Sequence, residues 1–124
     1  MKLAKSNVIS EKSIKYALRI IDLYKYLSTE KKETVLSKQI LRCGTSIGAN
    51  IEESLGGSTR KDFLNKLSIA YKESRETKYW LILLYKSNYI TKPMFDSMHK
   101  DCEELCKILS SIILTTKKSD DEKK

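Results

Sequence analysis

The chain has 124 residues, of which 24 are lysine or arginine and 16 are aspartate or glutamate, so its net charge is +8. This length is that of one domain that can bury a core without disulfides or a structural metal. With one proline, four glycines and two phenylalanines, the composition favours helices over strands and turns. An all-α domain is therefore predicted. Its basic balance suits an anionic partner, although a solvated basic surface is the more common meaning of such a charge.

The three cysteines, Cys43, Cys102 and Cys106, are an odd number and do not indicate a disulfide framework. The N-terminal sequence MKLAKSNVISEK has neither the apolar region nor the small-residue cleavage site of a signal peptide. No apolar run approaches the length that spans a bilayer. We therefore expect a reduced, cytoplasmic protein that does not associate with membranes.

Four helical segments are predicted in chain order, at about residues 10–28, 34–55, 60–87 and 93–116. Residues that favour helix ends lie at the boundaries: Ser10, Gly56, Gly57, Ser58, Thr59, Thr91 and Pro93. Short links between long helices place neighbours antiparallel, so residues 1–116 are predicted to form an up-and-down antiparallel four-helix bundle. The tail 117–124, KKSDDEKK, has no apolar residue and is predicted to be disordered.

The first segment is apolar over two adjacent faces. One face has Ile14, Ala17, Leu18, Ile21 and Tyr24, and the other has Tyr16, Ile20, Leu23 and Leu27. The third segment has a core stripe of Phe63, Leu67, Ala70, Tyr71, Ser74, Thr77, Leu81 and Leu84. A monomeric bundle needs one stripe per helix, so the additional apolar width predicts a homo-oligomer, with a wide core face as the alternative.

A second apolar group on the third segment is the candidate subunit interface. Ile69, Trp80 and Leu83 lie away from its core stripe, and Glu73 and Glu76 alternate with them. These carboxylates are expected to meet Lys or Arg from a neighbour and to fix the register of the interface. General acid–base catalysis by the pair is the weaker hypothesis, since nothing in the sequence indicates a cleft around them.

The second segment contains poor helix formers that need a physical reason. Gly44 and Gly48 are four residues apart beside the core stripe of Leu36, Ile40, Cys43, Ile47 and Ile51, and such small residues let another helix approach closely. Asn50 is expected to be a buried polar group, in one network with Ser46 and Glu53, that specifies register or assembly. A ligand site at Asn50 and Glu53 is the alternative.

His99, Cys102 and Cys106 share a 60° sector of the fourth segment, as three metal ligands on a helix would. Cys102 also continues the apolar stripe of Phe95, Met98, Leu105, Leu109 and Ile112. A closed zinc site needs a fourth ligand, and free cysteine is among the most buried residue types. We therefore predict core packing for the cysteines and no metal or other cofactor.

A basic sector of the third segment is the candidate nucleic-acid-binding surface. It contains Lys61, Lys72, Arg75, Tyr79 and Lys86 and no acidic residue. Positive charge at repeated spacing binds phosphates, and an aromatic ring is available for stacking on bases. A merely solvated face is about equally favoured by the sequence, because no phosphate-binding loop or RNA-recognition signature is present.

Three runs of sequence resemble a known family: QILRCGTSIGANIEES, DFLNKLSIAYKESRETKYWL and CEELCKILSSIILTT. The most specific marks are S-x-G-A-N-x-x-E and A-x-x-E-x-x-E-T-x-Y-W, carried by Ser46, Gly48, Ala49, Asn50, Glu53, Ala70, Glu73, Glu76, Thr77, Tyr79 and Trp80. They are similar to the four-helix bundle proteins encoded within intervening sequences of bacterial large-subunit ribosomal RNA genes. The resemblance runs from Asn7 to Lys117, and Cys43, where a serine is expected, is the departure from it.

This resemblance implies a bundle that assembles into a homopentameric barrel. The accessory protein of diversity-generating retroelements, which binds a reverse transcriptase and nucleic acid, is similar to the same family. No catalytic residue or cofactor is implied. The leading hypothesis is thus a non-enzymatic oligomeric scaffold that binds nucleic acid, alone or together with a protein partner. The alternatives are a protein–protein adaptor without a nucleic-acid role and, third, an enzyme.

Overall fold

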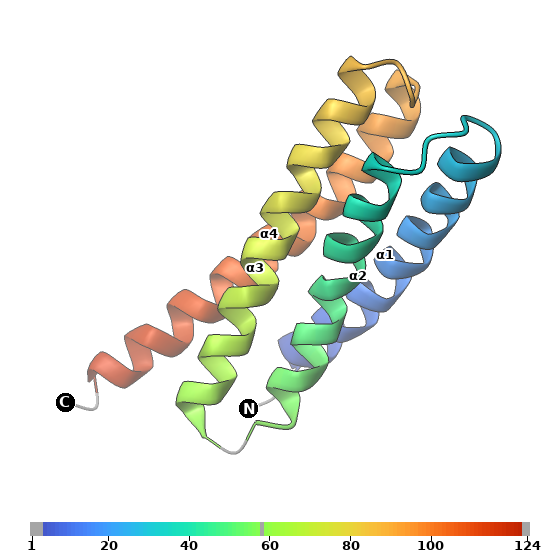
Figure 1. Cartoon of the computed structure of the whole chain (residues 1–124). Coiled ribbons are helices and arrows are strands. Elements are labelled where there is room, and N and C mark those ends of the chain that lie inside the picture. Colours follow the sequence, from blue (N-terminus) through green and yellow to red (C-terminus); the bar gives the residue numbers. More distant parts are fainter. Residues whose placement is uncertain (1–3, 58, 123–124) are drawn as a thin grey trace.

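A computed structural model of the chain describes residues 4–57 and 59–122. Its four helices are α1 (Ala4–Thr29), α2 (Leu36–Leu55), α3 (Arg60–Lys86) and α4 (Lys92–Glu122). In Figure 1 the α1–α2 and α3–α4 connections lie at one end of the molecule, and the α2–α3 connection lies at the other. Consecutive helices are therefore antiparallel, and the predicted all-α, up-and-down arrangement is confirmed.

Each helix packs against its neighbours in a ring. α1 contacts α2, α2 contacts α3, α3 contacts α4, and α4 closes the ring against α1. The C-terminal part of α4, drawn in red in Figure 1, runs away from the other three helices. Its later turns therefore leave apolar side chains uncovered, and Leu114 is 65% exposed.

The core consists of one apolar stripe from each helix. Its fully buried large side chains include Ile9, Ile20, Leu27, Ile40, Ile47, Ile51, Leu67, Leu81, Leu84, Leu105 and Leu109. Of the two apolar faces predicted for the first helix, the core takes the one with Tyr16 and Ile20. Ile14 and Leu18, on the other face, remain 55% and 58% exposed. The wide apolar surface of α1 is therefore not explained by the core of a single chain.

Two helices are longer than their sequence patterns predict. α1 begins at Ala4, six residues before the predicted cap Ser10, because Ile9 is buried and extends the stripe of Tyr16 and Ile20 toward the N-terminus. α4 continues to Glu122, so residues 117–122 of the predicted disordered tail are helical. No glycine or proline lies there to end the helix.

Side-chain caps begin α3 and α4. The Thr59 side chain accepts a hydrogen bond from the Asp62 backbone N–H at 3.0 Å, and Thr91 accepts one from the Met94 N–H at 3.3 Å. Ser58, the other candidate cap of α3, lies outside the described residues. Both threonines were predicted at these helix starts.

The start of α2 is capped by a residue that the sequence patterns did not single out. The Glu33 carboxylate accepts hydrogen bonds from the backbone N–H groups of Val35, Leu36 and Ser37, at 3.2, 2.9 and 2.7 Å. The Ser37 hydroxyl donates in return to the Glu33 carbonyl at 2.8 Å. Glu33 is buried, so one side chain satisfies three donors at this helix end away from water.

Candidate nucleic-acid interface

The two helical glycines of α2, Gly44 and Gly48, both face α1. A β-carbon added at Gly44 would lie 2.7 to 2.9 Å from three side-chain atoms of Ile20 in α1. One added at Gly48 would lie 3.1 Å from the Ser13 hydroxyl oxygen. The α1–α2 contact therefore depends on the absence of side chains at these positions, which is the packing role that the sequence predicts for them.

The polar residues of the same segment do not form one buried network. Asn50 is half-buried, and its Nδ2 donates to the Ser46 carbonyl of its own helix at 2.9 Å. Glu53 is exposed and forms an ion pair with Lys66 of α3 at 2.8 Å. The expectation of a fully buried Asn50 is therefore wrong for the single chain, and Glu53 joins α2 to α3 instead.

The carboxylates of the predicted subunit interface already have a cation within the chain. Arg42 of α2 pairs with both Glu73, at 3.4 Å, and Glu76 of α3. The Trp80 indole N–H also donates to Glu76 at 2.9 Å. Within the single chain these carboxylates therefore meet a cation of a neighbouring helix, and their role at a subunit interface stays a prediction. Near them Ile69 is 41% exposed, while Trp80 and Leu83 are half-buried.

The cysteines are packed inside the bundle. The Cys102 thiol donates to the Ser74 carbonyl at 3.2 Å, and Cys106 lies 2.9 Å from the Ser74 hydroxyl. Burial raises the pKa of Cys43 to about 11, and a hydrogen bond with Cys106 together with burial raises the pKa of Cys102. The Cys43 and Cys102 thiols are therefore held protonated and act as small core residues.

His99 does not join the cysteines in a metal site. Its ring lies 5.1 Å from that of Phe95 in a tilted contact. Among the described residues, no group of three histidine, cysteine or acidic side chains is arranged to hold a metal ion. No helix in the described ranges is long and apolar enough to cross a membrane.

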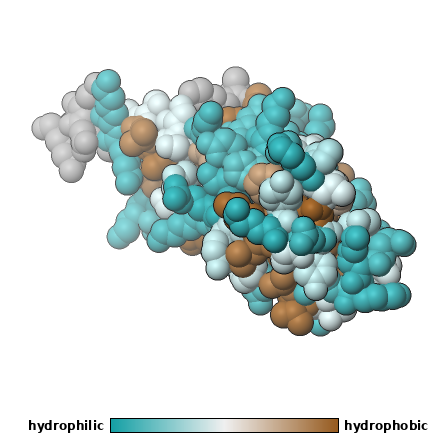
Figure 2. Space-filling model, turned by 90° about the horizontal axis from the view of Figure 1, so that it is seen from above, coloured by the Kyte–Doolittle hydropathy of each residue, from teal (hydrophilic) through white to brown (hydrophobic). Residues whose placement is uncertain are grey.

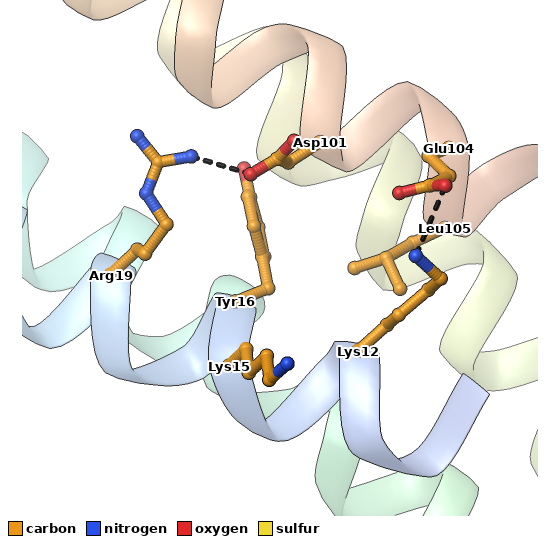
Figure 3. A pocket seen from close by; sticks show the side chains of 7 residues that line it. All are labelled: Lys12, Lys15, Tyr16, Arg19, Asp101, Glu104 and Leu105. Atoms are coloured by element: carbon orange, nitrogen blue, oxygen red, sulfur yellow. Dashed lines mark hydrogen bonds and ion pairs between the residues drawn. The ribbon is translucent and has the colours of Figure 1, made fainter. Parts of the chain in front are cut away.

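A pocket of about 170 Å³ between α1 and α4 is lined mostly by charged and polar side chains. Figure 3 shows two ion pairs at its sides, Arg19 with Asp101 at 2.5 Å and Lys12 with Glu104 at 3.2 Å. Between them the buried Tyr16 hydroxyl donates to the Met98 carbonyl at 3.0 Å, and burial raises its pKa well above 10. Lys12 and Arg19 are thus neutralised by acidic residues of α4, and the two ion pairs connect α1 to α4.

The basic stripe of α3 differs from this pocket in having no acidic ion-pair partner among the described residues. We define it as Lys61, Lys72, Arg75, Tyr79 and Lys86, all of which are exposed. Within the described ranges none of its cations forms a salt bridge. Lys78, the residue before Tyr79 in the chain, differs from them because it pairs with Glu103 of α4 at 2.7 Å. The stripe runs along the outer face of α3, opposite the buried Leu67, Ala70 and Leu81 side chains.

An aromatic group continues the stripe toward α4. The Arg75 guanidinium lies 5.9 Å from the ring centre of Tyr71, and its Nη1 donates to the Tyr71 hydroxyl at 3.3 Å. Tyr79 is 55% exposed, and its ring meets that of Trp80 edge-on at 5.3 Å. Cation and ring thus alternate along one face of the helix, as phosphate and base contacts require.

The sequence of the chain matches the family described as 23S rRNA-intervening sequence protein over residues 5–111. The chain belongs to this family. A crystal structure of a protein of unknown function from the S23 ribosomal protein family of Bacteroides thetaiotaomicron is 54% identical. That match covers 88% of this chain and 97% of the other, with a TM-score of 0.87. No curated protein matches the chain significantly.

Two surface features of the protein were not predicted from its sequence: the ion pairs of Arg42 and the position of Lys117. Arg42 was not assigned to Glu73 and Glu76, because a pairing between helices depends on how far each is rotated in the bundle. Lys117 lies beside Lys72 across the α3–α4 groove, although it falls in the predicted disordered tail. A continuous helical phase from Leu109 through Lys117, without glycine or proline, was the signal available for the second.

Proposed function

We propose that this family member is a non-enzymatic, homo-oligomeric helical scaffold that binds nucleic acid through the basic stripe of α3, alone or together with a protein partner. The observation that carries the proposal is the stripe itself: exposed cations along one helix face, free of acidic partners within the described ranges. Such cations favour binding of a nucleic acid, because each phosphate that they neutralise releases condensed counterions into solution.

Two of the three buried cysteines are poorly suited to nucleophilic catalysis, which supports a scaffold. Cys43 and Cys102 are buried thiols with raised pKa values, so they are poor nucleophiles at neutral pH. The polar α1–α4 pocket holds two of its cations in ion pairs across the helix contact. The buried free thiols also suit a reducing compartment, and we place the protein in the cytoplasm.

We infer that the scaffold is a homopentamer, a number that comes from the family resemblance. The uncovered apolar face of α1 supports association, since Ile14 and Leu18 are each more than half exposed. The face of the molecule in Figure 2 is mostly hydrophilic, with separate hydrophobic patches among the polar side chains. A closed ring with head-to-tail contacts uses two different surfaces of each subunit. The second candidate surface lies on α3 and consists of Ile69, Glu73, Glu76, Trp80 and Leu83.

Changing Leu18 to glutamate is expected to dissociate the oligomer while leaving the bundle folded, because Leu18 is 58% exposed in the single chain. Analytical ultracentrifugation at micromolar concentration measures the assembly, and circular dichroism measures the fold. Lys25→Glu, at an exposed position of the same helix, is the control and should keep the oligomer. A wild-type protein that sediments as a monomer would remove the oligomer from the proposal.

Reversing two charges of the stripe, in the variant Lys72→Glu/Arg75→Glu, is expected to weaken nucleic-acid binding uniformly across sequences. Each phosphate contact contributes about −0.9 to the slope of log affinity against log salt for duplex DNA, and about −0.7 for single strands. We therefore expect a tenfold or greater loss at low salt and a slope shallower by about 1–2. Fluorescence anisotropy with mixed-sequence RNA and DNA, at low and physiological salt, provides both quantities.

The matched control is Lys25→Glu/Lys38→Glu, which changes the net charge equally at exposed positions of α1 and α2. It should lower affinity much less than the stripe variant. If the wild type binds neither RNA nor DNA at low salt, the stripe is a solvated face. The protein–protein adaptor then becomes the leading function.

A further inference from the structure

A groove between α3 and α4 adjoins the basic stripe and differs from it in character. It has a volume of about 310 Å³ and is lined by Ser68, Tyr71, Lys72, Ser110, Ile113, Leu114 and Lys117. Its lining contains no carboxylate. Lys72 of α3 and Lys117 of α4 are exposed, and the same lining includes the half-buried Ile113 and the exposed Leu114.

One ring of the groove lining, that of Tyr71, belongs to a series of flat groups along α3 that continues into the basic stripe. Tyr71, Arg75 and Tyr79 follow one another at four-residue intervals on α3, which corresponds to a rise of about 6 Å from each to the next. The Arg75 guanidinium already lies near the Tyr71 ring, and the Tyr79 side chain is 55% exposed, with its ring edge-on against Trp80. Flat groups thus alternate with cations over about two helical turns.

Such a surface distinguishes single strands from duplexes. In a duplex the faces of the bases are covered by their neighbours, so a protein surface reaches phosphates, sugars and base edges. In a single strand the bases can turn outward and stack on aromatic and guanidinium planes while the backbone follows the positive charges. Lysines next to apolar side chains suit the phosphates and the exposed bases of a single strand, whereas a duplex backbone gains only from the lysines.

From this geometry we propose that the α3–α4 groove and the adjoining basic stripe together bind single-stranded nucleic acid, with phosphates at Lys72, Arg75 and Lys117 and bases at Tyr71, Tyr79 and the apolar side chains of the groove. The inference rests on the proposed function and deepens it, because it names the form of nucleic acid and adds α4 to the interface. RNA and DNA single strands share this chemistry, so both are tested.

The first test compares a 20-nucleotide single strand with a 20-base-pair duplex of the same sequence, each as RNA and as DNA, by fluorescence anisotropy at physiological salt. The single strand is expected to bind at least 10-fold more tightly. Tyr79→Ala should weaken single-strand binding roughly 5- to 150-fold, the usual range for one stacked base, and leave duplex binding unchanged. Tyr79→Phe keeps the ring and should bind as the wild type does.

The second test concerns α4 and uses adjacent lysines. Lys117→Glu should weaken single-strand binding about 5-fold or more, whereas Lys118→Glu, an identical change one residue outside the groove lining, should have little effect. Equal binding of single strand and duplex, with no effect of Tyr79→Ala or Lys117→Glu, would overturn the groove while leaving the basic stripe in place. Loss of all binding in the wild type would instead overturn the proposed function.

Discussion

Replacing Gly44 with leucine is expected to lower the free energy of unfolding by about 2–3 kcal/mol and the melting temperature by roughly 10 °C. The reason is steric. Even a β-carbon at this position would lie 2.7 to 2.9 Å from three atoms of Ile20, which is fully buried. α1 would have to move away from α2, and the core contacts along both helices would weaken together.

The control for this prediction is Ala49→Leu, at an exposed position of the same helix, which should leave the melting temperature nearly unchanged. Gly48→Leu should fall between the two, because the closest group there is the Ser13 hydroxyl at 3.1 Å and Gly48 is half-buried. Thermal and urea unfolding measure all three variants. A Gly44→Leu protein as stable as the wild type would contradict the close helix contact.

Comparing Gly44→Ala in the wild type and in an Ile20→Ala variant separates the effect of crowding from that of helix propensity. Alanine is a better helix former than glycine by about 1 kcal/mol, so Gly44→Ala gains propensity while it crowds Ile20. In an Ile20→Ala background the crowding atoms are gone. Gly44→Ala is then expected to stabilise the protein, although Ile20→Ala itself costs about 2–5 kcal/mol. A change of sign between the two backgrounds would assign the effect to the contact with Ile20.

The helices were predictable because their apolar residues recur with the helical period over many turns. Cys43, Ile47 and Ile51 of α2 are all buried as predicted, as are Leu67 and Leu81 of α3. The choice between the two apolar faces of α1 was not predictable in this way. Ile14 and Tyr16 belong to equally regular stripes, and which one enters the core depends on the rotation of α1 against α2 and α4.

The candidate site was predictable to the extent that it lies on a single helix. Lys72, Arg75 and Tyr79 share one face because of helix geometry alone, and the structure leaves that face exposed. Contacts between helices were not predictable. The pairing of Arg42 with Glu76 and the position of Lys117 beside Lys72 depend on rotations and on the path of α4, which periodicity does not contain.

Glu33 shows a different limit, because its role depends on the conformation of a connection. Lys32, the residue before it, has a positive φ of 56°, and this turn directs the Glu33 side chain back over the first turn of α2. In the sequence STEKKE the two glutamates look alike. Capping patterns place Ser, Thr, Asp or Asn at such a position, so a glutamate two residues before the N-cap Val35 was not recognised.

Changing Glu33 to alanine is expected to lower the free energy of unfolding by about 2–4 kcal/mol, since three backbone N–H groups lose a charged acceptor in a buried site. Glu33→Gln keeps one carbonyl oxygen and should cost about half as much. Glu30→Ala, at an exposed position of the same connection, is the control and should cost little. Hydrogen exchange provides a local readout: the amides of Leu36 and Ser37 should lose protection in Glu33→Ala before those in the middle of α2. Equal stability of the Glu33 and Glu30 variants would show that water replaces the carboxylate without cost.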